Sequence, residues 1–336
     1  MCTAALALLA GPLAAQEVTL KLHEFLPAGS TVPREIVHVW ADKIEEESQN
    51  RIKIDRFSGM ALGGAPPELM DQTIDGVTDI AWTVVGYTPG RFPQTEVFEL
   101  PFQLRDGAEA SCAFWTMYEE HMTEDFADVK VLGTWVHGPG VIHSAEPVET
   151  PADLDGLKVR GGSRIVNEVL EAAGATPVGM PVPAVPEALS KGVIDATTIP
   201  WEVTGSLKTS DLVEYHTEFE GEWLYTLTFV MVMNKDVFAG LPADLQAVIE
   251  ENSGLDFSIF AGKTQQAFDA PEREVAVENG NEIFLVTETG PWTAAVTPII
   301  ADWVADMSEI GVDGQALIDQ SQALMAGQCA GADADL

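Results

Sequence analysis

The sequence predicts an α/β protein built as a two-lobed clamp, in which each lobe holds a mixed or parallel sheet flanked by helices. Three observations predict this architecture. The chain has 336 residues, which is more than one compact domain usually needs. Short strand patterns alternate with helix patterns, as in parallel βαβ units. The order Pro-Glu, helix, Gly, strand occurs at 67–82 and again at 186–196, which indicates two lobes built alike.

The first 15 residues resemble a secretory signal peptide. Residues 4–15 read AALALLAGPLAA, an apolar run that ends in small residues. The small residues at its end predict cleavage near Ala15–Gln16, and the run is shorter than the roughly 20 residues that span a bilayer. No basic region precedes the run, which suggests a truncated start. No later segment offers about 18 uninterrupted apolar residues, so the mature protein is expected to be soluble.

In the first half of the chain, the patterns predict regularly alternating elements. Apolar and polar residues alternate at 18–22, as in a half-buried strand, and a loop follows at 23–27. The next expected elements are a helix at 33–48, a strand at 51–57, a helix at 66–75 and a strand at 77–82. Ser30 or Thr31 can cap the first helix, and Gly76 suits the C′ position of the second.

The second half of the chain becomes increasingly helical. Its expected elements are a short helix ending at Gly156, a strand ending at Arg160, helices at 163–174 and 186–191, and a strand at 193–196. The last third is expected to hold an amphipathic helical region at 241–279 broken at Gly254 and Pro271, a strand at 282–286, helices at 291–310 and 313–325, and a frayed acidic end at 327–336.

The charge of the chain excludes some partners. There are 53 acidic and 17 basic residues, for a formal net charge of −36. Such a field repels a phosphate backbone, so nucleic acid is excluded as a partner, and an anionic membrane surface is disfavoured. We expect a soluble surface suited to a salty medium that screens the repulsion. An anionic ligand would need a strong local positive site.

The sequence shows no motif for catalysis, a cofactor or a metal. It has no Gly-x-Ser-x-Gly elbow, no Walker loop and no Gly-x-Gly-x-x-Gly after a strand, and its histidines lack metal-binding spacing. We therefore predict that the protein is not an enzyme and binds no cofactor. Cys112 and Cys329 remain after signal cleavage, and an oxidising compartment would permit a disulfide between them, which the sequence leaves open.

Arg160 is the strongest candidate for a ligand-binding residue. It ends a predicted parallel strand, where ligands bind in open α/β sheets, and the helix that starts at Ser163 favours an anion at the same place. A guanidinium there can make two parallel bonds to a carboxylate, with Arg164 assisting. The alternative is that Arg160 pairs with a buried acid such as Glu202 or Asp195.

Other candidates lie at strand ends that the topology turns toward a cleft between the lobes. Trp82 ends a strand in the first lobe and Trp201 follows the matching strand in the second, so both can pack a ligand, or else form ordinary core. The remaining candidates are His23, Glu24, Tyr87 and His143. His137 and His143 can donate hydrogen bonds to a ligand or serve as structural histidines. An aromatic cage around a cationic amine, faced by Glu24 or Glu202, is a further alternative.

Several segments, taken in order, resemble the solute-binding proteins of TRAP transporters, of the dicarboxylate-binding (DctP) type. The matching segments are GVTD at 76–79, ELPF at 99–102, PADL at 151–154, GLKVR at 156–160, GATP at 174–177, EALSKGVID at 187–195, MNK at 233–235 and LPADL at 241–245. Each is weak alone, but the ordered set is specific and covers nearly the whole mature chain.

The resemblance implies a periplasmic protein that closes on a small organic acid and delivers it to a two-part membrane permease. It implies two α/β lobes with a long helix crossing both, which we place at 17–140 plus about 232–275 and at about 141–231 plus 276–336. It also implies that Arg160 is the family's ligand-carboxylate arginine. A monomer is expected, because the protein must dock to a permease.

One departure from the family pattern bears on the ligand. Many members carry a second arginine in a Gly-x-Arg pattern, where this chain reads Gly138-Pro139-Gly140, and glycine there is expected to leave room. The missing anchor argues against dicarboxylates, sialic acid and uronic acids. We therefore expect a monocarboxylate with an apolar or aromatic body, packed against Trp82, Tyr87 and Trp201. A secreted two-lobed enzyme is the least favoured alternative.

Overall fold

The structure is a computed structural model that describes residues 17–336. The predicted signal peptide at 1–15 lies outside the described residues. Within 17–336, no helix is long and apolar enough to cross a membrane.

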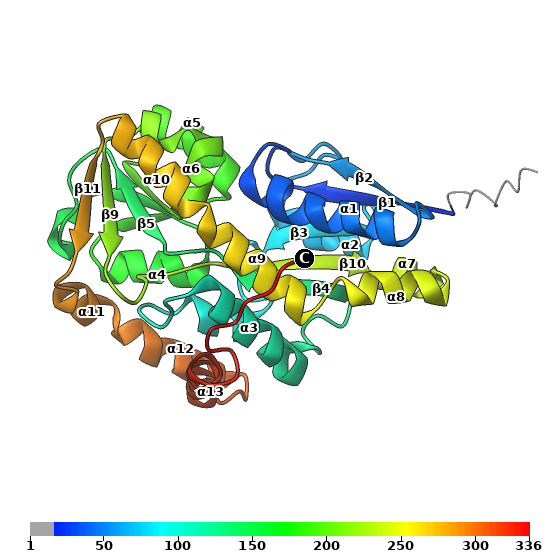
Figure 1. The fold of residues 1–336 in the computed structure, drawn as a ribbon. Coiled ribbons are helices and arrows are strands. Elements are labelled where there is room, and N and C mark those ends of the chain that lie inside the picture. Colours follow the sequence, from blue (N-terminus) through cyan, green and yellow to red (C-terminus); the bar gives the residue numbers. More distant parts are fainter. Residues whose placement is uncertain (1–16) are drawn as a thin grey trace, which may run out of the picture.

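Two mixed sheets form the frame, and both match the predicted fold class (Figure 1). The first sheet has the order β2 (Ile52–Phe57), β1 (Val18–Glu24), β3 (Ile80–Val84), β10 (Thr228–Asn234) and β4 (Val129–Val136). The second has the order β11 (Glu282–Val286), β9 (Tyr215–Phe219), β5 (Val141–Ser144), β8 (Ala196–Ile199), β6 (Lys158–Gly161) and β7 (Thr176–Gly179). In each sheet one strand, β10 or β5, runs antiparallel to both of its neighbours.

Helices flank both sheets. Around the first sheet they are α1 (His38–Glu47), α2 (Leu69–Ile74), α3 (Gly107–Met117), α7 (Lys235–Gly240) and α8 (Ala243–Glu251). Around the second they are α4 (Arg164–Ala172), α5 (Val185–Ser190) and α6 (Trp201–Leu207). The chain ends in α11 (Gly290–Val296), α12 (Pro298–Glu309) and α13 (Gly314–Ala326), which run back below both sheets in Figure 1. The lobe boundaries given above stay a prediction, although the strands divide between the sheets at the expected places.

The region at 241–279 crosses the molecule, as Figure 1 shows. It consists of α8, α9 (Leu255–Ala267) and α10 (Asp269–Glu278). The predicted break at Gly254 is present, with a φ of +86°. The second break lies at Phe268 and not at Pro271. Pro271 sits in the first turn of α10, where the missing amide hydrogen costs nothing.

The repeated Gly-Val-x-Asp segments form the same turn in both lobes. The amides of Val77 and Val193 donate back to Gln72 O and Ala188 O, both at 2.9 Å, as in a Schellman ending. Asp79 Oδ2 then accepts from Lys21 N at 2.7 Å, and Asp195 Oδ2 accepts from Lys158 N at 2.9 Å. Because these turns include residues that the sequence pattern places in strands, β3 and β8 begin about three residues later than predicted.

The C-terminal end packs against the first lobe, so the expected fraying is wrong. Cys329 is fully buried and forms a disulfide with Cys112 of α3. Lys263 of α9 pairs with Asp335 at 2.9 Å and with Asp333. The disulfide and these ion pairs hold the acidic tail along α9, where Figure 1 shows it in red.

Candidate functional site

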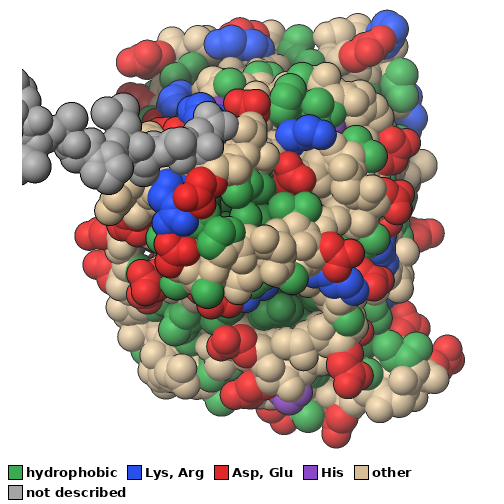
Figure 2. Space-filling view, turned by 90° about the vertical axis from the view of Figure 1, so that its right-hand side faces the viewer, with side chains coloured by type: hydrophobic (Ala, Val, Ile, Leu, Met, Phe, Trp, Pro, Cys, Tyr) green, Lys and Arg blue, Asp and Glu red, His purple; other side chains and the backbone are tan. Residues whose placement is uncertain are grey.

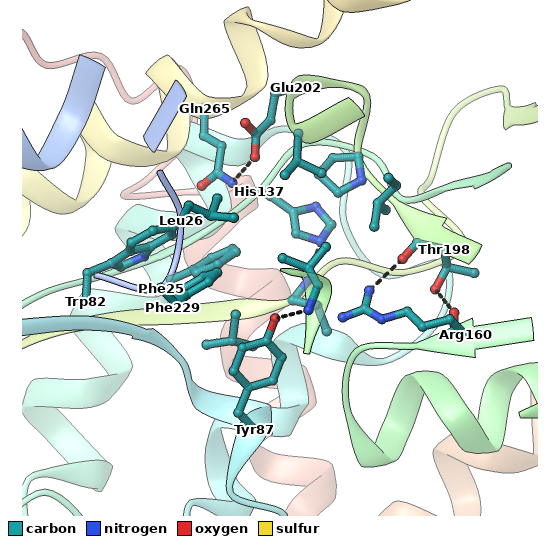
Figure 3. Close-up of a pocket in the computed structure, with 16 residues that line it drawn as sticks. Phe25, Leu26, Trp82, Tyr87, His137, Arg160, Thr198, Glu202, Phe229 and Gln265 are labelled. Carbon is teal, nitrogen blue, oxygen red and sulfur yellow. Dashed lines mark hydrogen bonds between the residues drawn. The ribbon is translucent and has the colours of Figure 1, made fainter. Parts of the chain in front are cut away.

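A pocket lies between the two sheets and is lined by residues of both lobes. Its walls come from the ends of β3 and β10 on one side and of β6 and β8 on the other, with α6 and α9 closing it. Phe25, Trp82 and Phe229 form one wall in Figure 3, and Arg160 enters from the opposite side. All of these side chains are buried, so the described conformation is a closed one.

Among residues 17–336, Arg160 is the only arginine or lysine in the lining of this cavity. It is 1% exposed. Its Nε donates to Met180 O and its Nη1 to Thr198 O, both at 2.9 Å, while Nη2 has no hydrogen-bond partner within residues 17–336. A guanidinium keeps its charge at any ordinary pH, and an unpaired buried charge is costly. The site therefore favours an anion at Nη2.

The alternative partners of Arg160 are engaged elsewhere. Asp195 accepts from Lys158 N, as described for the repeated turns, and Glu202 Oε1 accepts from Gln265 Nε2 at 2.6 Å. Among the ion pairs of the described chain, none includes Arg160. The structure thus contradicts the interpretation in which Arg160 pairs with a buried acid. It also disfavours the cationic-amine cage, because a guanidinium occupies the same cavity.

Arg164 lies outside the cavity, in contrast to its predicted assisting role. Its Nη2 pairs with Glu96 at 2.6 Å, and its Nη1 contacts Glu168 at 3.0 Å and Asp306 at 2.8 Å. Ser163 caps α4 by accepting from Val166 N at 3.2 Å, and it does not line the cavity either. Glu96, Glu168 of α4 and Asp306 of α12 hold the Arg164 side chain outside the cavity.

Aromatic rings make up the flat walls of the cavity. Phe25 and Trp82 stack with centroids 4.2 Å apart, and Trp82 and Phe229 stack at 5.8 Å. Tyr87 meets Phe25 edge-on at 5.7 Å, and its hydroxyl accepts from Val182 N at 2.9 Å. The predicted candidates Trp82 and Tyr87 therefore line the cavity. Phe25 and Phe229 were missed, although Phe25 lies in the loop predicted to follow the first strand and directly follows β1 in the structure.

His137 lines the cavity as a neutral ring and offers no free donor. Its Nε2 accepts from Leu227 N at 3.0 Å, and its Nδ1 donates to Gly138 O at 2.5 Å. Burial lowers the pKa of His137 to about 3. The ring therefore contributes an apolar edge, and the expected hydrogen bond from His137 to a ligand has no donor to supply it.

The predicted residues His23 and Glu24 do not line the cavity. His23 Nδ1 is hydrogen-bonded to Gln72 Oε1 at 2.8 Å. Glu24 Oε2 accepts from Ser58 at 2.7 Å and from His38 at 2.9 Å. Side chains alternate between the two faces of a strand, so a position at the strand end does not by itself turn a side chain toward the cavity.

His143 and Trp201 also lie outside the cavity, within the second lobe. His143 Nε2 donates to Ile199 O at 3.1 Å, and its Nδ1 accepts from His216 Nδ1 at 2.7 Å. Burial lowers the pKa of His143 well below its usual value. Trp201 donates to Glu218 Oε1 at 2.7 Å. Both side chains pack in the interior of the second lobe.

The glycines of the Gly-Pro-Gly segment do not open space for a ligand, which corrects our expectation. A Cβ at Gly138 would lie 2.0 Å from Asp269 Oδ2, and a Cβ at Gly140 would lie 2.0 Å from the ring of Tyr225. Protein side chains already fill these positions. The segment still supplies no second basic anchor.

A second polar feature of the cavity is the pair Glu202 and Gln265, at the top of Figure 3. Glu202 is 3% exposed, and burial raises its pKa to about 7. Its Oε2 has no hydrogen-bond partner within residues 17–336. Gln265 was missed at the sequence level because it comes from α9, more than a hundred residues after Arg160, and no local pattern marks it.

A closed two-lobed fold around an apolar cavity with one unpaired cation is the arrangement of a solute-binding protein for small anions. The comparisons agree. Residues 23–306 match the family "Bacterial extracellular solute-binding protein, family 7", and the chain belongs to this family of TRAP-type, DctP-type binding proteins. The family consists of solute receptors.

Two solved structures and one curated relative show the range of similar proteins. A TRAP solute-binding protein from Rhodoferax ferrireducens T118, in complex with copurified benzoate, has 44% identity and a TM-score of 0.91 over 92% of this chain and 98% of that one. A marine metagenome protein specific for aromatic acids, with 3-hydroxybenzoate, has 41% identity and a TM-score of 0.90 over 93% and 99%. The "Outer membrane transporter protein TsaT" of Comamonas testosteroni is 30% identical over 95% of each chain.

Proposed function

We propose that this protein captures an aromatic monocarboxylate in the cavity, with the carboxylate bound to Arg160. The single observation that carries the proposal is the buried Nη2 of Arg160, which has no partner among the described residues. A carboxylate there would neutralise the guanidinium and accept its remaining hydrogen bonds. The benzoate and 3-hydroxybenzoate of the two similar structures support this ligand class.

The rest of the cavity suits a flat apolar body. Phe25, Trp82 and Phe229 offer ring faces, and His137 adds a neutral edge. No second arginine or lysine from the described part of the chain lines the cavity, so the second carboxylate of a dicarboxylate would be buried without a counter-charge. We expect dicarboxylates and uronic acids to bind weakly for this reason.

The proposal includes the cellular setting. The protein would work in the periplasm as a monomer and would deliver its ligand to a membrane permease, with no catalysis, no cofactor and no nucleic-acid partner. Acidic side chains are scattered over the face shown in Figure 2, in keeping with the net charge of −36. The negative electrostatic field of these side chains repels an anionic ligand, so the ligand site needs a local cation.

A thermal-shift screen tests the ligand class. The purified mature protein is heated with benzoate, an apolar aliphatic monocarboxylate, a C4 dicarboxylate, glucuronate and an aromatic amine. A ligand at a thousandfold over its Kd stabilises the folded state by about 4 kcal/mol, which raises Tm by several degrees. We expect the largest shift with benzoate. A shift confined to the amine or to the dicarboxylate would contradict the proposal.

A further inference from the structure

We propose that Glu202, oriented by Gln265, recognises a hydroxyl group on the ring of the bound acid, so that the preferred ligand is a hydroxylated aromatic monocarboxylate and not the unsubstituted one. This inference rests on the proposed function and deepens it, because Arg160 would bind the carboxylate while Glu202 would accept a hydrogen bond from the ring hydroxyl.

The orientation of Gln265 is settled by hydrogen-bond chemistry. The indole Nε1 of Trp135 can only donate, and it donates to Gln265 Oε1 at 2.8 Å. The amide nitrogen of Gln265 therefore faces Glu202 and donates to Glu202 Oε1 at 2.6 Å. One carboxylate oxygen of Glu202 is thus occupied by a fixed donor.

The other carboxylate oxygen, Oε2, is buried and has no hydrogen-bond partner among residues 17–336. The Glu202 side chain belongs to the lining of the cavity. A buried polar atom left unpaired is costly, so a ligand that supplies a donor gains affinity over one that does not. A phenolic hydroxyl is such a donor, and it is also neutral, which suits an acidic surrounding.

Other acids pack around Glu202 and make a second anionic group on the ligand unfavourable there. Its backbone amide donates to Asp269 Oδ1 at 2.9 Å, and Glu272 lies close enough to disfavour its ionised form. A second carboxylate on the ligand would meet this acidic pair directly. Arg160, on a different side of the cavity in Figure 3, is the group that takes the negative charge.

The separation of the two groups limits the position of the hydroxyl. Arg160 comes from β6, whereas Glu202 lies in the first turn of α6 and contacts Gln265 of α9. In Figure 3 the two side chains enter the cavity from different directions. An ortho hydroxyl lies beside the carboxylate and would stay with Arg160, so we assign Glu202 to a meta or para hydroxyl.

Isothermal titration of the full mature protein with benzoate and with 2-, 3- and 4-hydroxybenzoate tests the inference. We expect the 3- or the 4-hydroxy acid to bind about tenfold or more tightly than benzoate, because a buried polar atom left without a hydrogen-bond partner costs roughly one to two factors of ten in affinity. In Glu202→Leu this advantage should fall to about twofold or less, while benzoate still binds. Glu202→Gln, which retains the shape and the contact with Gln265, serves as a second variant if the leucine variant is unstable.

Glu99→Gln is the matched control, because Glu99 is also buried, has its pKa raised to about 7 and lies outside this cavity. It should retain the hydroxyl advantage. Equal affinities for benzoate and both 3- and 4-hydroxybenzoate in the wild type, or an advantage unchanged in both Glu202 variants, would overturn the inference and leave the proposed function standing. If no aromatic acid binds at all, the proposed function fails first.

Discussion

The hydroxyl of Tyr87 accepts a 2.9 Å hydrogen bond from the backbone amide of Val182, and this bond joins the two lobes at the edge of the ligand cavity. Tyr87 follows β3 of the first sheet, whereas Val182 follows β7 of the second. The bond can form only when the lobes are closed. Because the cavity is lined from both sides, ligand contacts and this bond would favour the same closed state.

Tyr87→Phe should therefore weaken ligand binding without removing the aromatic wall. The variant loses one hydrogen bond between the lobes, which is worth about 1 kcal/mol, so we expect Kd for benzoate to rise about fivefold. Small-angle scattering should show a larger mean radius for the ligand-free variant than for the wild type. An unchanged Kd would show that the bond does not favour closure.

The disulfide between Cys112 and Cys329 should stabilise the protein without affecting the ligand site. The two residues are 217 positions apart, and cross-links that close long loops typically contribute about 2–5 kcal/mol. We expect the urea midpoint of unfolding to fall clearly when the protein is reduced, or in Cys112→Ser with Cys329→Ser. The Kd for benzoate should stay within about twofold of the wild type. Identical midpoints for the oxidised and reduced protein would contradict this prediction.

Buried acids should make the ligand-free protein less stable as the pH rises. Burial raises the pKa of Glu99 to about 7, above its value of 4.5 in an unfolded chain. The neutral carboxyl of Glu99 therefore stabilises the folded state below about pH 4.5, and this contribution is lost as the pH rises through about 7. Buried neutral histidines such as His137 have the opposite effect. Their contribution to the stability of the folded protein is lost as the pH falls below about 6.5.

The contribution of Glu99 is therefore measured as a difference between variants. The unfolding free energy of the wild type minus that of Glu99→Gln should decrease between pH 4.5 and pH 7 by up to about 3 kcal/mol, because one pKa unit corresponds to about 1.4 kcal/mol. A difference that stays constant over this range would show that Glu99 titrates normally in the folded protein.

Some features of the fold and site could be predicted because local patterns specify them. The Gly-Val-x-Asp turns follow from a glycine that must adopt a positive φ and an aspartate that accepts from the next strand. Arg160 could be proposed as a ligand-binding residue because ligands bind at the carboxyl ends of parallel strands in open α/β sheets. The turns also explain the error in the strand limits, because the residues after each glycine complete the preceding helix.

Other features depend on packing between distant segments. His23, Glu24, His143 and Trp201 lie at or near strand ends, yet their side chains point to partners inside a lobe, and the sequence pattern does not reveal which face a terminal residue takes. Arg164 lies beside the right helix terminus but is drawn to Glu96, far away in the chain. Gln265 reaches the cavity only because α9 crosses between the sheets, which no local signal indicates.

The affinity for benzoate of the wild type and of Arg160→Leu, measured by isothermal titration, tests the central claim most directly. Arg105→Ala, which removes a solvent-exposed arginine, is the control for the change in net charge. We predict that the Arg160 variant stays folded and binds benzoate at least a hundredfold more weakly than the wild type, because the loss of a charge-assisted bidentate contact removes about 3 kcal/mol or more. Comparable affinities in Arg160→Leu and in the control would contradict the assignment of Arg160 as the carboxylate-binding residue.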